Sequence, residues 1–170
     1  MQKQITAQNT LAVTTKIVLP NDCNTLGNLM GGNLLSWLDL NSAVSAHRFC
    51  KRVVVTATVN HVAFDHAIKL GDFVTIESKV SRSFNSSMEV YSDVYVEHHT
   101  TGRKIKCNEA IYTFVAVDQL GSPIEVPELV PETDLEKERF AAALRRRQLS
   151  LILAKKMKPN DATELKNLFS

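Results

Sequence analysis

One segment limits the possible folds of this chain more than any other. After the pair Gly31-Gly32 comes a long run without Gly or Pro, which predicts a helix from about Gly32 or Asn33 to Phe49. Apolar residues line one face of this helix, and three more lie on the opposite side: Trp37, Leu40 and Val44. A helix that is apolar nearly all round is normally buried on all sides. In a chain of 170 residues, a single buried helix indicates a sheet that wraps around it.

The chain around this helix has the composition of β-strands. Segments rich in β-branched or alternating apolar residues occupy 11–19, 53–64, 73–83, 87–97 and 104–118. The continuous apolar run at 53–64 is typical of a central strand, and most later connections are short enough for antiparallel pairing in a meander. We therefore predict an α+β protein with the hotdog fold, in which a five-stranded antiparallel sheet wraps around a long central helix.

A C-terminal addition follows this predicted core. A proline-rich, extended exit at 121–131 leads to a second helix at 132–153, which opens with the capping pattern Thr133-x-x-Glu136. Residues 161–170 form either a short final helix or a frayed end. The predicted organisation is a hotdog domain at 1–130 and a helical extension at 131–170.

Composition excludes several classes of protein. The net charge of +2 is too small to indicate a nucleic-acid partner, and basic residues cluster only near the C-terminus. Three cysteines without a CxxC pair predict free thiols in a reducing compartment. Residues 1–10 are too polar for a signal peptide, and no run approaches the roughly 20 apolar residues of a membrane helix. We expect a cytoplasmic protein with no nucleic-acid or membrane partner.

Several short motifs follow one another in residues 10–135. They are Asp22, Asn24, Gly27, Gly31-Gly32, Asp39, Thr56, Phe64 and Gly71-Asp72. In order and spacing they resemble the acyl-CoA hydrolase (acyl-CoA thioesterase) family of hotdog proteins. One position departs from that family, whose members often have Gly-Arg or a similar pair before a Ser-rich strand start, where this chain has Phe84-Asn85. The departure removes a basic residue from that point and leaves the expected chemistry unchanged.

Asp39 is the first candidate for a catalytic group. It lies two turns inside the predicted helix, too deep for an N-cap, and no Lys or Arg within four residues could pair with it. A buried carboxylate is costly unless it is paired or hydrogen-bonded, and the plainer explanation is an Asp that anchors a neighbouring loop. By resemblance to the family, Asp39 is the general base or the nucleophile of thioester hydrolysis. The sequence does not separate these two mechanisms.

The loop before the helix and the start of the helix supply the next candidates. Asn24 is of a type common in plain turns. By resemblance, it works with the Asp and the two come from different subunits, so we expect Asn24 of one chain to meet Asp39 of its neighbour. Gly31 and Gly32 suit a helix start that needs permissive backbone. Their unpaired N–H groups would also suit the developing oxyanion of a thioester carbonyl.

Contacts to the substrate are expected further along the chain. By resemblance, the pantetheine arm runs past the strand that carries Thr56, and Ser86 and Ser87 lie where the family often meets coenzyme A. Two polar residues that simply open a strand explain the serines equally well. Basic runs at 103–104 and 145–147 are candidates for the phosphates, although a solvated charge run is the commoner explanation. The histidines show no recognised zinc spacing, so no metal site is expected.

The resemblance implies an acyl-CoA thioesterase that releases free fatty acid and coenzyme A. It forms at least a dimer, often a trimer of dimers, and coenzyme A enters as part of the substrate with no metal or redox cofactor. Two alternatives stay open. A non-catalytic coenzyme A or nucleotide sensor would bind without turnover. An acyl-thioester dehydratase would release an enoyl product, but such enzymes tend to pair a His with the Asp, and no His precedes Asp39 in the loop or helix.

Overall fold

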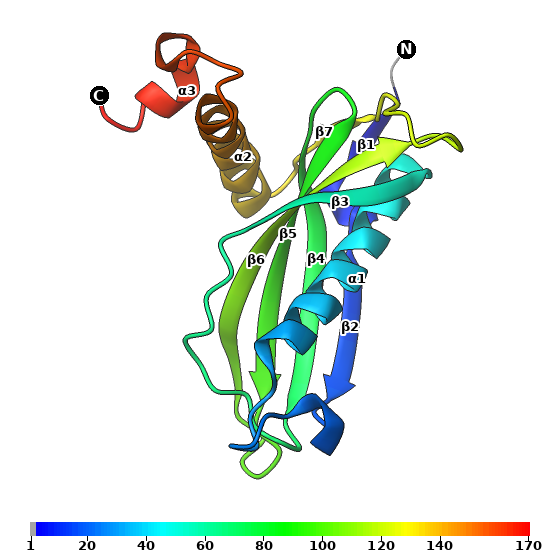
Figure 1. Ribbon diagram of the computed structural model, residues 1–170, viewed down its shortest axis with the longest axis vertical. Coiled ribbons are helices and arrows are strands. Elements are labelled where there is room, and N and C mark those ends of the chain that lie inside the picture. Colours follow the sequence, from blue (N-terminus) through cyan, green and yellow to red (C-terminus); the bar gives the residue numbers. More distant parts are fainter. Residues whose placement is uncertain (1–2) are drawn as a thin grey trace.

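The computed structural model describes residues 3–170, and Met1 and Gln2 lie outside the described residues. Five strands form one antiparallel sheet in the order β2-β4-β5-β6-β3 (Figure 1). Their bounds are β2 Ala12–Ile17, β3 Val53–Asn60, β4 Phe73–Ser83, β5 Ser87–Glu97 and β6 Lys104–Val117. The sheet curls around one long helix, α1, which spans Gly31–Cys50. The predicted hotdog fold is confirmed.

Helix α1 lies along the concave face of the sheet, but the sheet covers only part of it. The predicted apolar face is in the core, where Leu34, Leu38, Ala46 and Phe49 are buried. On the opposite side Trp37 is also buried, whereas Leu40 is 63% exposed and Val44 is 45% exposed. The prediction of a helix buried on all sides is therefore wrong for the single chain, because no element of residues 3–170 covers this last side.

Strand β3 differs from its prediction in length and in place. The sequence predicts a central strand at 53–64, but β3 ends at Asn60 and forms an edge of the sheet, paired only with β6. His61 adopts a left-handed backbone with φ of 56°, which ends the extended strand. The chain then crosses back to β4, so that β4, β5 and β6 form the meander and β3 does not belong to it.

Polar side chains inside the core set the rotation of α1 against the sheet. Asn41 Nδ2 donates to the carbonyl of Ala12 at 3.0 Å and to Ser78 Oγ at 2.7 Å, and Thr14 Oγ1 donates to Asn41 Oδ1 at 2.8 Å. These bonds satisfy an amide that would otherwise be buried without partners. Because Asn41 faces β2 and β4, the side of α1 that carries Asp39 faces β3.

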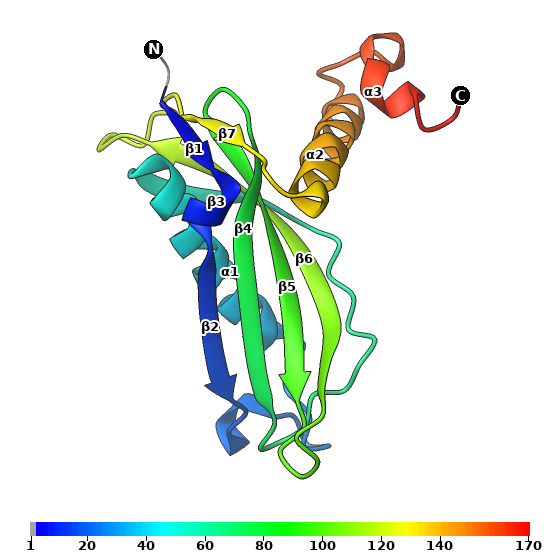
Figure 2. The same ribbon diagram turned by 180° about the vertical axis from the view of Figure 1, so that it is seen from behind.

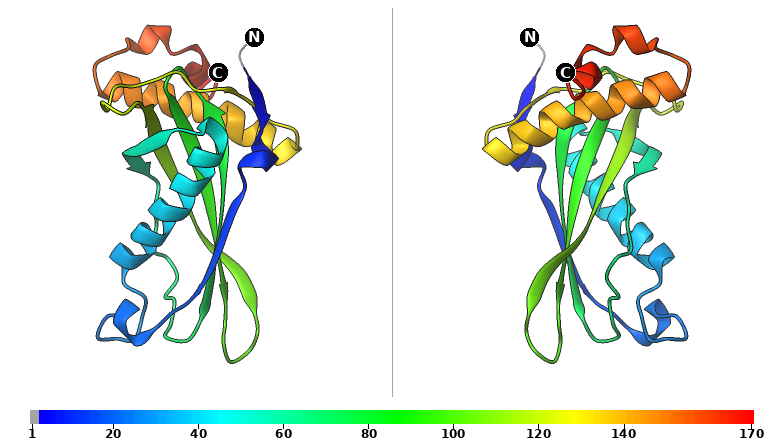
Figure 3. Two further views of the ribbon diagram at one scale, coloured as in Figure 1. Left: turned by 90° about the vertical axis from the view of Figure 1, so that its right-hand side faces the viewer. Right: turned by 90° about the vertical axis from the view of Figure 1, so that its left-hand side faces the viewer.

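Helix α2, Asp134–Leu153, lies on the outer face of the sheet and across one of its ends (Figures 2 and 3). Its first turn has the predicted capping box. Thr133 Oγ1 accepts from Glu136 N at 3.1 Å, and Glu136 Oε2 accepts from Thr133 N at 3.1 Å. The predicted start of this helix is therefore confirmed by its cap.

Ion pairs hold α2 to the outer face. Arg146 makes two hydrogen bonds to Glu89, of 2.9 and 2.7 Å, and Arg139 makes two to Asp93, both of 2.9 Å. Glu89 is only 4% exposed. The explanation of the basic run 145–147 as a solvated face is thus wrong for Arg146, whose partner sits on a strand far away in sequence.

Several short elements complete the chain. The strands β1, Gln4–Thr6, and β7, Glu128–Val130, pair in parallel, and neither was predicted because three-residue segments show no period. Short 3₁₀ helices lie at Ala7–Thr10, Pro20–Asp22 and Pro159–Asp161, and α3 spans Thr163–Lys166. Residues 161–170 were predicted to form either a short final helix or a frayed end, and the structure has the short helix. The cysteines Cys23, Cys50 and Cys107 are free, as predicted.

The division of the chain at residue 130 stays a prediction, since α2 is joined to the sheet by the ion pairs above. Among the helices of residues 3–170, none has the length and apolar character that crossing a bilayer requires.

Replacing Arg146 by Gln removes the cation that pairs with the buried Glu89 carboxylate and leaves it the hydrogen bond from Ser81 Oγ. We expect Arg146→Gln to lower the free energy of unfolding by about 3 kcal/mol, because an unpaired buried charge keeps its desolvation penalty. Urea denaturation followed by circular dichroism measures the change. Arg145→Gln is the matched control, since Arg145 has no carboxylate partner among residues 3–170. Equal unfolding midpoints for the two variants would contradict this role of the ion pair.

Candidate active site

Asp39 lies two turns into α1, on the side that faces β3. It is half-buried, and its Oδ1 accepts a hydrogen bond of 2.7 Å from Thr56 Oγ1. No cation pairs with Asp39 anywhere in residues 3–170. A carboxylate with a single donor and no counter-ion has lone pairs free to accept a proton or to attack carbon. The structure thus brings two predicted site residues, one from a helix and one from a strand, into direct contact.

A β-bulge keeps Thr56 on the helix-facing side of β3. Thr56 pairs with Phe114 and Thr58 pairs with Thr113, so Ala57 is the extra residue of the bulge. Phe114 points into the core and is 1% exposed, and Thr56 shares its face of the sheet. After the bulge, Thr58 lies on the outer face, where it lines a cavity described below. The irregularity therefore presents Thr56 to one side of the sheet and its next two neighbours to the other.

Tyr112 reaches the same turn of α1 from β6. It is 1% exposed, and its hydroxyl donates to the carbonyl of Leu35 at 3.0 Å. Burial, together with the nearby charge of Asp39, raises the pKa of Tyr112 to about 12, so the phenol keeps its proton at neutral pH. Leu35 lies one helical turn before Asp39, so this bond holds the turn that carries the carboxylate. Sequence analysis missed Tyr112, although it is the hydroxyl-bearing residue of an otherwise apolar strand face.

The N-terminus of α1 presents two unpaired donors. Met30 is the N-cap residue but makes no side-chain capping bond, and the first turn contains no acidic residue. The carbonyl of Met30 accepts from Asn33 N and Leu34 N, whereas no group within residues 3–170 accepts from the N–H of Gly31 or Gly32. Free N–H groups at the positive end of a helix dipole suit a developing oxyanion.

Asn24 shapes the loop before α1. Its Oδ1 accepts from Leu26 N at 3.0 Å and from Asn28 N at 3.2 Å, while its exposed Nδ2 has no hydrogen-bond partner in residues 3–170. No hydrogen bond joins Asn24 to Asp39 within the described chain. Within one chain Asn24 is therefore a turn residue with a free amide group, and its pairing with a neighbour's Asp39 stays a prediction.

Comparison with known proteins places this geometry in a family. The model of the Thioesterase superfamily matches residues 26–102. A Bacillus subtilis (strain 168) protein, named the uncharacterized acyl-CoA thioester hydrolase YkhA, is 42% identical over 124 residues, which cover 73% of this chain and 72% of that protein. The chain belongs to the acyl-CoA thioesterase family.

Two mammalian members of the family are much longer than this chain. Mouse acyl-coenzyme A thioesterase 11 is 37% identical over 85% of this chain, and the rat cytosolic acyl coenzyme A thioester hydrolase is 34% identical over 73% of it. The chain spans only 24% and 33% of the lengths of these two relatives.

Solved structures of this thioesterase family match the fold over most of its length. A hexameric acyl-CoA thioesterase has a TM-score of 0.86 and 32% identity, with coverage of 89% of this chain and 97% of that one. An acyl-CoA hydrolase from Staphylococcus aureus in complex with butyryl coenzyme A, coenzyme A and coenzyme A disulfide has a TM-score of 0.82 and 29% identity, covering 91% and 96%. Alanine variants of an Asn, an Asp and a Thr of that enzyme match as well.

In this chain, Ser86 and Ser87 border a cavity on the outer face of the sheet. The cavity holds about 160 Å³, and α2 contributes Arg146 and Arg147 to its wall. Arg146 is occupied by its ion pair. Arg147 has no carboxylate partner in residues 3–170, and its guanidinium lies 5.3 Å from the ring centre of Phe84. The two serines and Arg147 thus line the same cavity. Arg147 lies beside Phe84, at the position where family members often have Gly-Arg.

The other basic pair does not reach these serines. Lys104 begins β6, whereas Ser87 pairs with Val115 near the end of the same strand. The ammonium group of Lys104 lies 5.3 Å from the ring centre of Tyr95. Within one chain, the run 103–104 therefore lies at the opposite end of the sheet from the serines.

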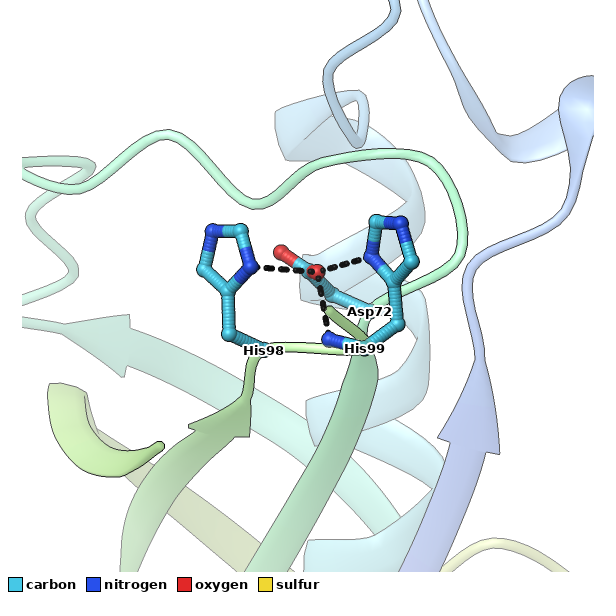
Figure 4. A group of neighbouring side chains, drawn as sticks. All are labelled: Asp72, His98 and His99. Atoms are coloured by element: carbon cyan, nitrogen blue, oxygen red, sulfur yellow. Dashed lines mark hydrogen bonds and ion pairs between the residues drawn. The ribbon is translucent and has the colours of Figure 1, made fainter. Parts of the chain in front are cut away.

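Asp72, His98 and His99 form a second polar cluster (Figure 4). Asp72 is 1% exposed, and its Oδ1 lies 2.8 Å from His99 Nδ1 and 3.7 Å from His98 Nδ1. Burial alone would raise the pKa of Asp72, but hydrogen bonds from His99 and from Lys69 N lower it, so the carboxylate is charged at neutral pH. The three ligand-type atoms lie within 4.8 Å of one another, as a metal site would require, although these hydrogen bonds already account for the arrangement. Sequence analysis missed the cluster because Asp72 is remote from the histidines along the chain.

The two glycines at the start of α1 should respond differently to an added methyl group. A Cβ on Gly31 would lie 3.2 Å from the ring of Phe64, whereas a Cβ on Gly32 would meet nothing within 4 Å. We expect Gly32→Ala to raise the free energy of unfolding by about 0.5 kcal/mol, because alanine loses less backbone entropy on folding. Gly31→Ala should gain less, because the ring of Phe64 must move; urea denaturation measures both. Phe64→Ala should remove the difference between them. A Gly32→Ala protein less stable than Gly31→Ala would contradict this account of the helix start.

Proposed function

We propose that this chain hydrolyses acyl-CoA thioesters to a free fatty acid and coenzyme A. The observation that carries the proposal is the half-buried carboxylate of Asp39, held by Thr56 and without a counter-ion among residues 3–170. Thioester hydrolysis requires a water deprotonated beside the carbonyl carbon, or a carboxylate that attacks that carbon directly. The relative named as an acyl-CoA thioester hydrolase and the hydrolase solved with butyryl coenzyme A support this chemistry. The name of the rat relative supports a cytoplasmic location.

The spacing of three residues supports the assignment of the site. In the Staphylococcus aureus enzyme, the Asn, Asp and Thr that were replaced by alanine are separated by 15 and 17 residues. Asn24, Asp39 and Thr56 have the same separations in this chain. We infer that the three are equivalent to those residues: Asn24 and Asp39 act in catalysis, and Thr56 orients the carboxylate.

The geometry of α1 favours a site shared between two chains. Asp39 follows Gly31 by eight residues, which is about 12 Å along the helix axis. A reacting carbonyl must lie about 3 Å from both its attacking group and its oxyanion donors. The helix start of one chain is therefore too far from its own Asp39, and the proposed site combines Asp39 and Thr56 of one chain with Asn24, Gly31 and Gly32 of the second.

The surface beside Asp39 is suited to a second copy of this chain. Leu40 and Val44 of α1 are 63% and 45% exposed. On the adjacent edge strand β3, Val53 and Val55 alternate with the α1-facing Thr56, so they point to the outer face, where they are 64% and 47% exposed. Because β3 pairs only with β6, one row of its backbone donors and acceptors has no partner in the sheet. A dimer that covers this edge buries both features, and the hexameric thioesterase of similar structure supports a trimer of such dimers.

Each group in the proposed site has a defined role. As a general base, Asp39 takes a proton from the water that attacks the thioester carbonyl; as a nucleophile, it forms an acyl anhydride that water then cleaves. In either route the oxyanion lies against the N–H groups of Gly31 and Gly32, and Asn24 Nδ2 orients the water or the carbonyl. In the general-base route the C–S bond breaks as the intermediate collapses to the fatty acid, and the coenzyme A thiolate takes the proton held by Asp39. In the nucleophile route the C–S bond breaks as the anhydride forms, the thiolate takes a proton from solvent, and water cleaves the anhydride afterwards. The proposed reaction uses only these groups and needs no metal or redox cofactor.

We place the nucleotide end of coenzyme A at the cavity beneath α2. Arg147 supplies a guanidinium that is free to bind phosphate oxygens, and the hydroxyl groups of Ser86 and Ser87 supply hydrogen-bond donors at the same cavity. The C-terminal helix would in this way provide the basic residue that Phe84-Asn85 lacks.

Asp39→Ala and Asn24→Ala should each abolish release of free thiol from acyl-CoA. We expect a loss of about 100-fold or more, because each variant removes a group that acts on the reacting carbonyl. The assay follows thiol release with a chromogenic reagent across short to long acyl chains. Circular dichroism and size-exclusion chromatography verify folding and assembly. Full turnover by Asp39→Ala would exclude Asp39 as the base or nucleophile.

Mixing the two inactive variants tests whether the site is shared. After dissociation and reassociation in equal amounts, about half of the dimers contain one chain of each kind, and one of their two sites is intact. Activity should return to about a quarter of the wild-type level. Asp39→Ala mixed with the double variant Asn24→Ala/Asp39→Ala is the control and should stay inactive. No recovery would contradict the shared site.

Two results with the wild type would favour the alternative functions. Binding of coenzyme A without thioester turnover would favour the sensor, and an enoyl product would favour the dehydratase.

Arg147→Gln should raise the KM for acyl-CoA about tenfold and leave kcat near the wild-type value, because it removes a phosphate contact remote from the reacting carbon. With the same acyl group on pantetheine, which lacks the nucleotide phosphates, KM should not change. Arg145→Gln is the matched control, since it removes a neighbouring charge that does not line the cavity. An equal rise in KM for the pantetheine ester would contradict the placement.

A further inference from the structure

The loop that carries Asn24 is hydrogen-bonded to residues 68–72, the segment that leads into β4. Two backbone hydrogen bonds join the two segments as an isolated antiparallel bridge between Asn28 and Lys69: Leu29 N donates to the carbonyl of Ile68 at 2.7 Å, and Leu70 N donates to that of Gly27 at 3.0 Å. Because Asn24 Oδ1 accepts from Asn28 N, the position of Asn24 depends on where residues 68–72 lie.

Asp72 holds that segment in place. Its Oδ2 accepts from Lys69 N at 3.0 Å, and its Oδ1 accepts from His99 N at 3.3 Å and lies 2.8 Å from His99 Nδ1 (Figure 4). Its carbonyl accepts from Val18 N at 2.9 Å. Asp72 therefore joins three segments at one end of the sheet: the residues after β2, the segment 68–72 and the turn after β5.

We propose that Asp72, bound by His99, is a positioning residue for Asn24. It keeps residues 68–72 where they hold the loop, so that Asn24 Nδ2 points toward the Asp39 of the second chain. This inference rests on the catalytic role proposed above for Asn24. Asp72 has no hydrogen bond to Asn24 or to Asp39, so its effect passes through the backbone contacts of Gly27 and Asn28.

The charge of Asp72 is part of this role. Both carboxylate oxygens accept hydrogen bonds, one from Lys69 N and the other from His99. An amide in its place offers one acceptor and turns an N–H group toward one of these donors. Asp72→Asn thus preserves the size of the side chain and releases one of the two segments that the carboxylate joins.

Asp118 provides a matched control at the other end of the sheet, since β6 runs from the turn after β5 to Asp118. Its Oδ1 also closes a turn, by accepting from Leu120 N at 2.8 Å and from Ser122 N at 2.9 Å. These bonds stay within residues 118–122, so Asp118 has no link to the Asn24 loop.

A double-mutant cycle on thiol release tests the inference. We expect Asp72→Asn to lower kcat about tenfold with a change in KM below about twofold, because a small displacement of a catalytic group lowers the rate with little effect on binding. In the Asn24→Ala background, Asp72→Asn should change the residual kcat by less than about twofold, because the group it positions is gone. Asp118→Asn should leave kcat unchanged in both backgrounds.

The outcomes separate this inference from the proposed function. Asp72→Asn could lower kcat by the same factor in the wild-type and Asn24→Ala backgrounds, or it could leave kcat unchanged in both. Either result would show that Asp72 does not act through Asn24, and it would overturn the inference without affecting the proposed hydrolase activity. Wild-type kcat in Asn24→Ala would overturn the role of Asn24 itself. If Asp72→Asn does not fold, His99→Leu takes its place in the cycle, with a loss of about threefold expected in the wild-type background alone.

Discussion

The hydrogen bonds of one buried amide determine where α1 can present its functional groups. Asn41 Nδ2 donates to Ser78 Oγ at 2.7 Å and to the carbonyl of Ala12 at 3.0 Å, in a position that is 3% exposed. Rotation of the helix by one residue, about 100°, would break these bonds and leave the amide buried without partners, at a cost of about 1–3 kcal/mol. With the rotation fixed, Asp39 can face only β3, where Thr56 binds it. Apolar packing alone would fix the rotation less sharply, since α1 is apolar on most of its surface.

The bulge at Ala57 gives β3 a role on both faces of the sheet. Thr56 faces α1 and binds Asp39, whereas Thr58 and Asn60 line the outer cavity that also contains Arg147. Under the proposed function, the nucleotide lies on the outer face and the thioester on the inner face. The pantetheine arm must then pass from one face of the sheet to the other beside β3, where the two chains of the proposed dimer meet.

Sequence patterns predicted the elements of this fold well and their partners less well. The bounds of α1 were predicted to within two residues, and the capping box of α2 was predicted correctly, because both depend on local backbone rules. The pairing of β3 with β6 was not predicted, since side-chain alternation describes the faces of a strand and leaves its neighbours open. Asp39 was selected from its position in a helix without a nearby cation, together with the resemblance to the family. Tyr112 and Asp72 could not, because their roles arise from contacts with residues that are remote in sequence.

The two errors in predicted burial concern neighbouring elements at the same edge of the molecule, and they share a cause. The run at the start of β3 has the β-branched composition of a strand buried on both faces, and Leu40 and Val44 give α1 its apolar far side. In the single chain, however, Val53 is 64% exposed and Leu40 is 63% exposed. A sequence is adapted to the burial of side chains in the assembled protein. A segment with more apolar residues than the single chain buries therefore indicates that another chain covers them. Here the exposed apolar residues lie on the far side of α1 and on the outward face of β3, the two elements that carry Asp39 and Thr56. Burial and the distance from Asp39 to the helix start, which are independent constraints, thus both support the proposed dimer at this edge.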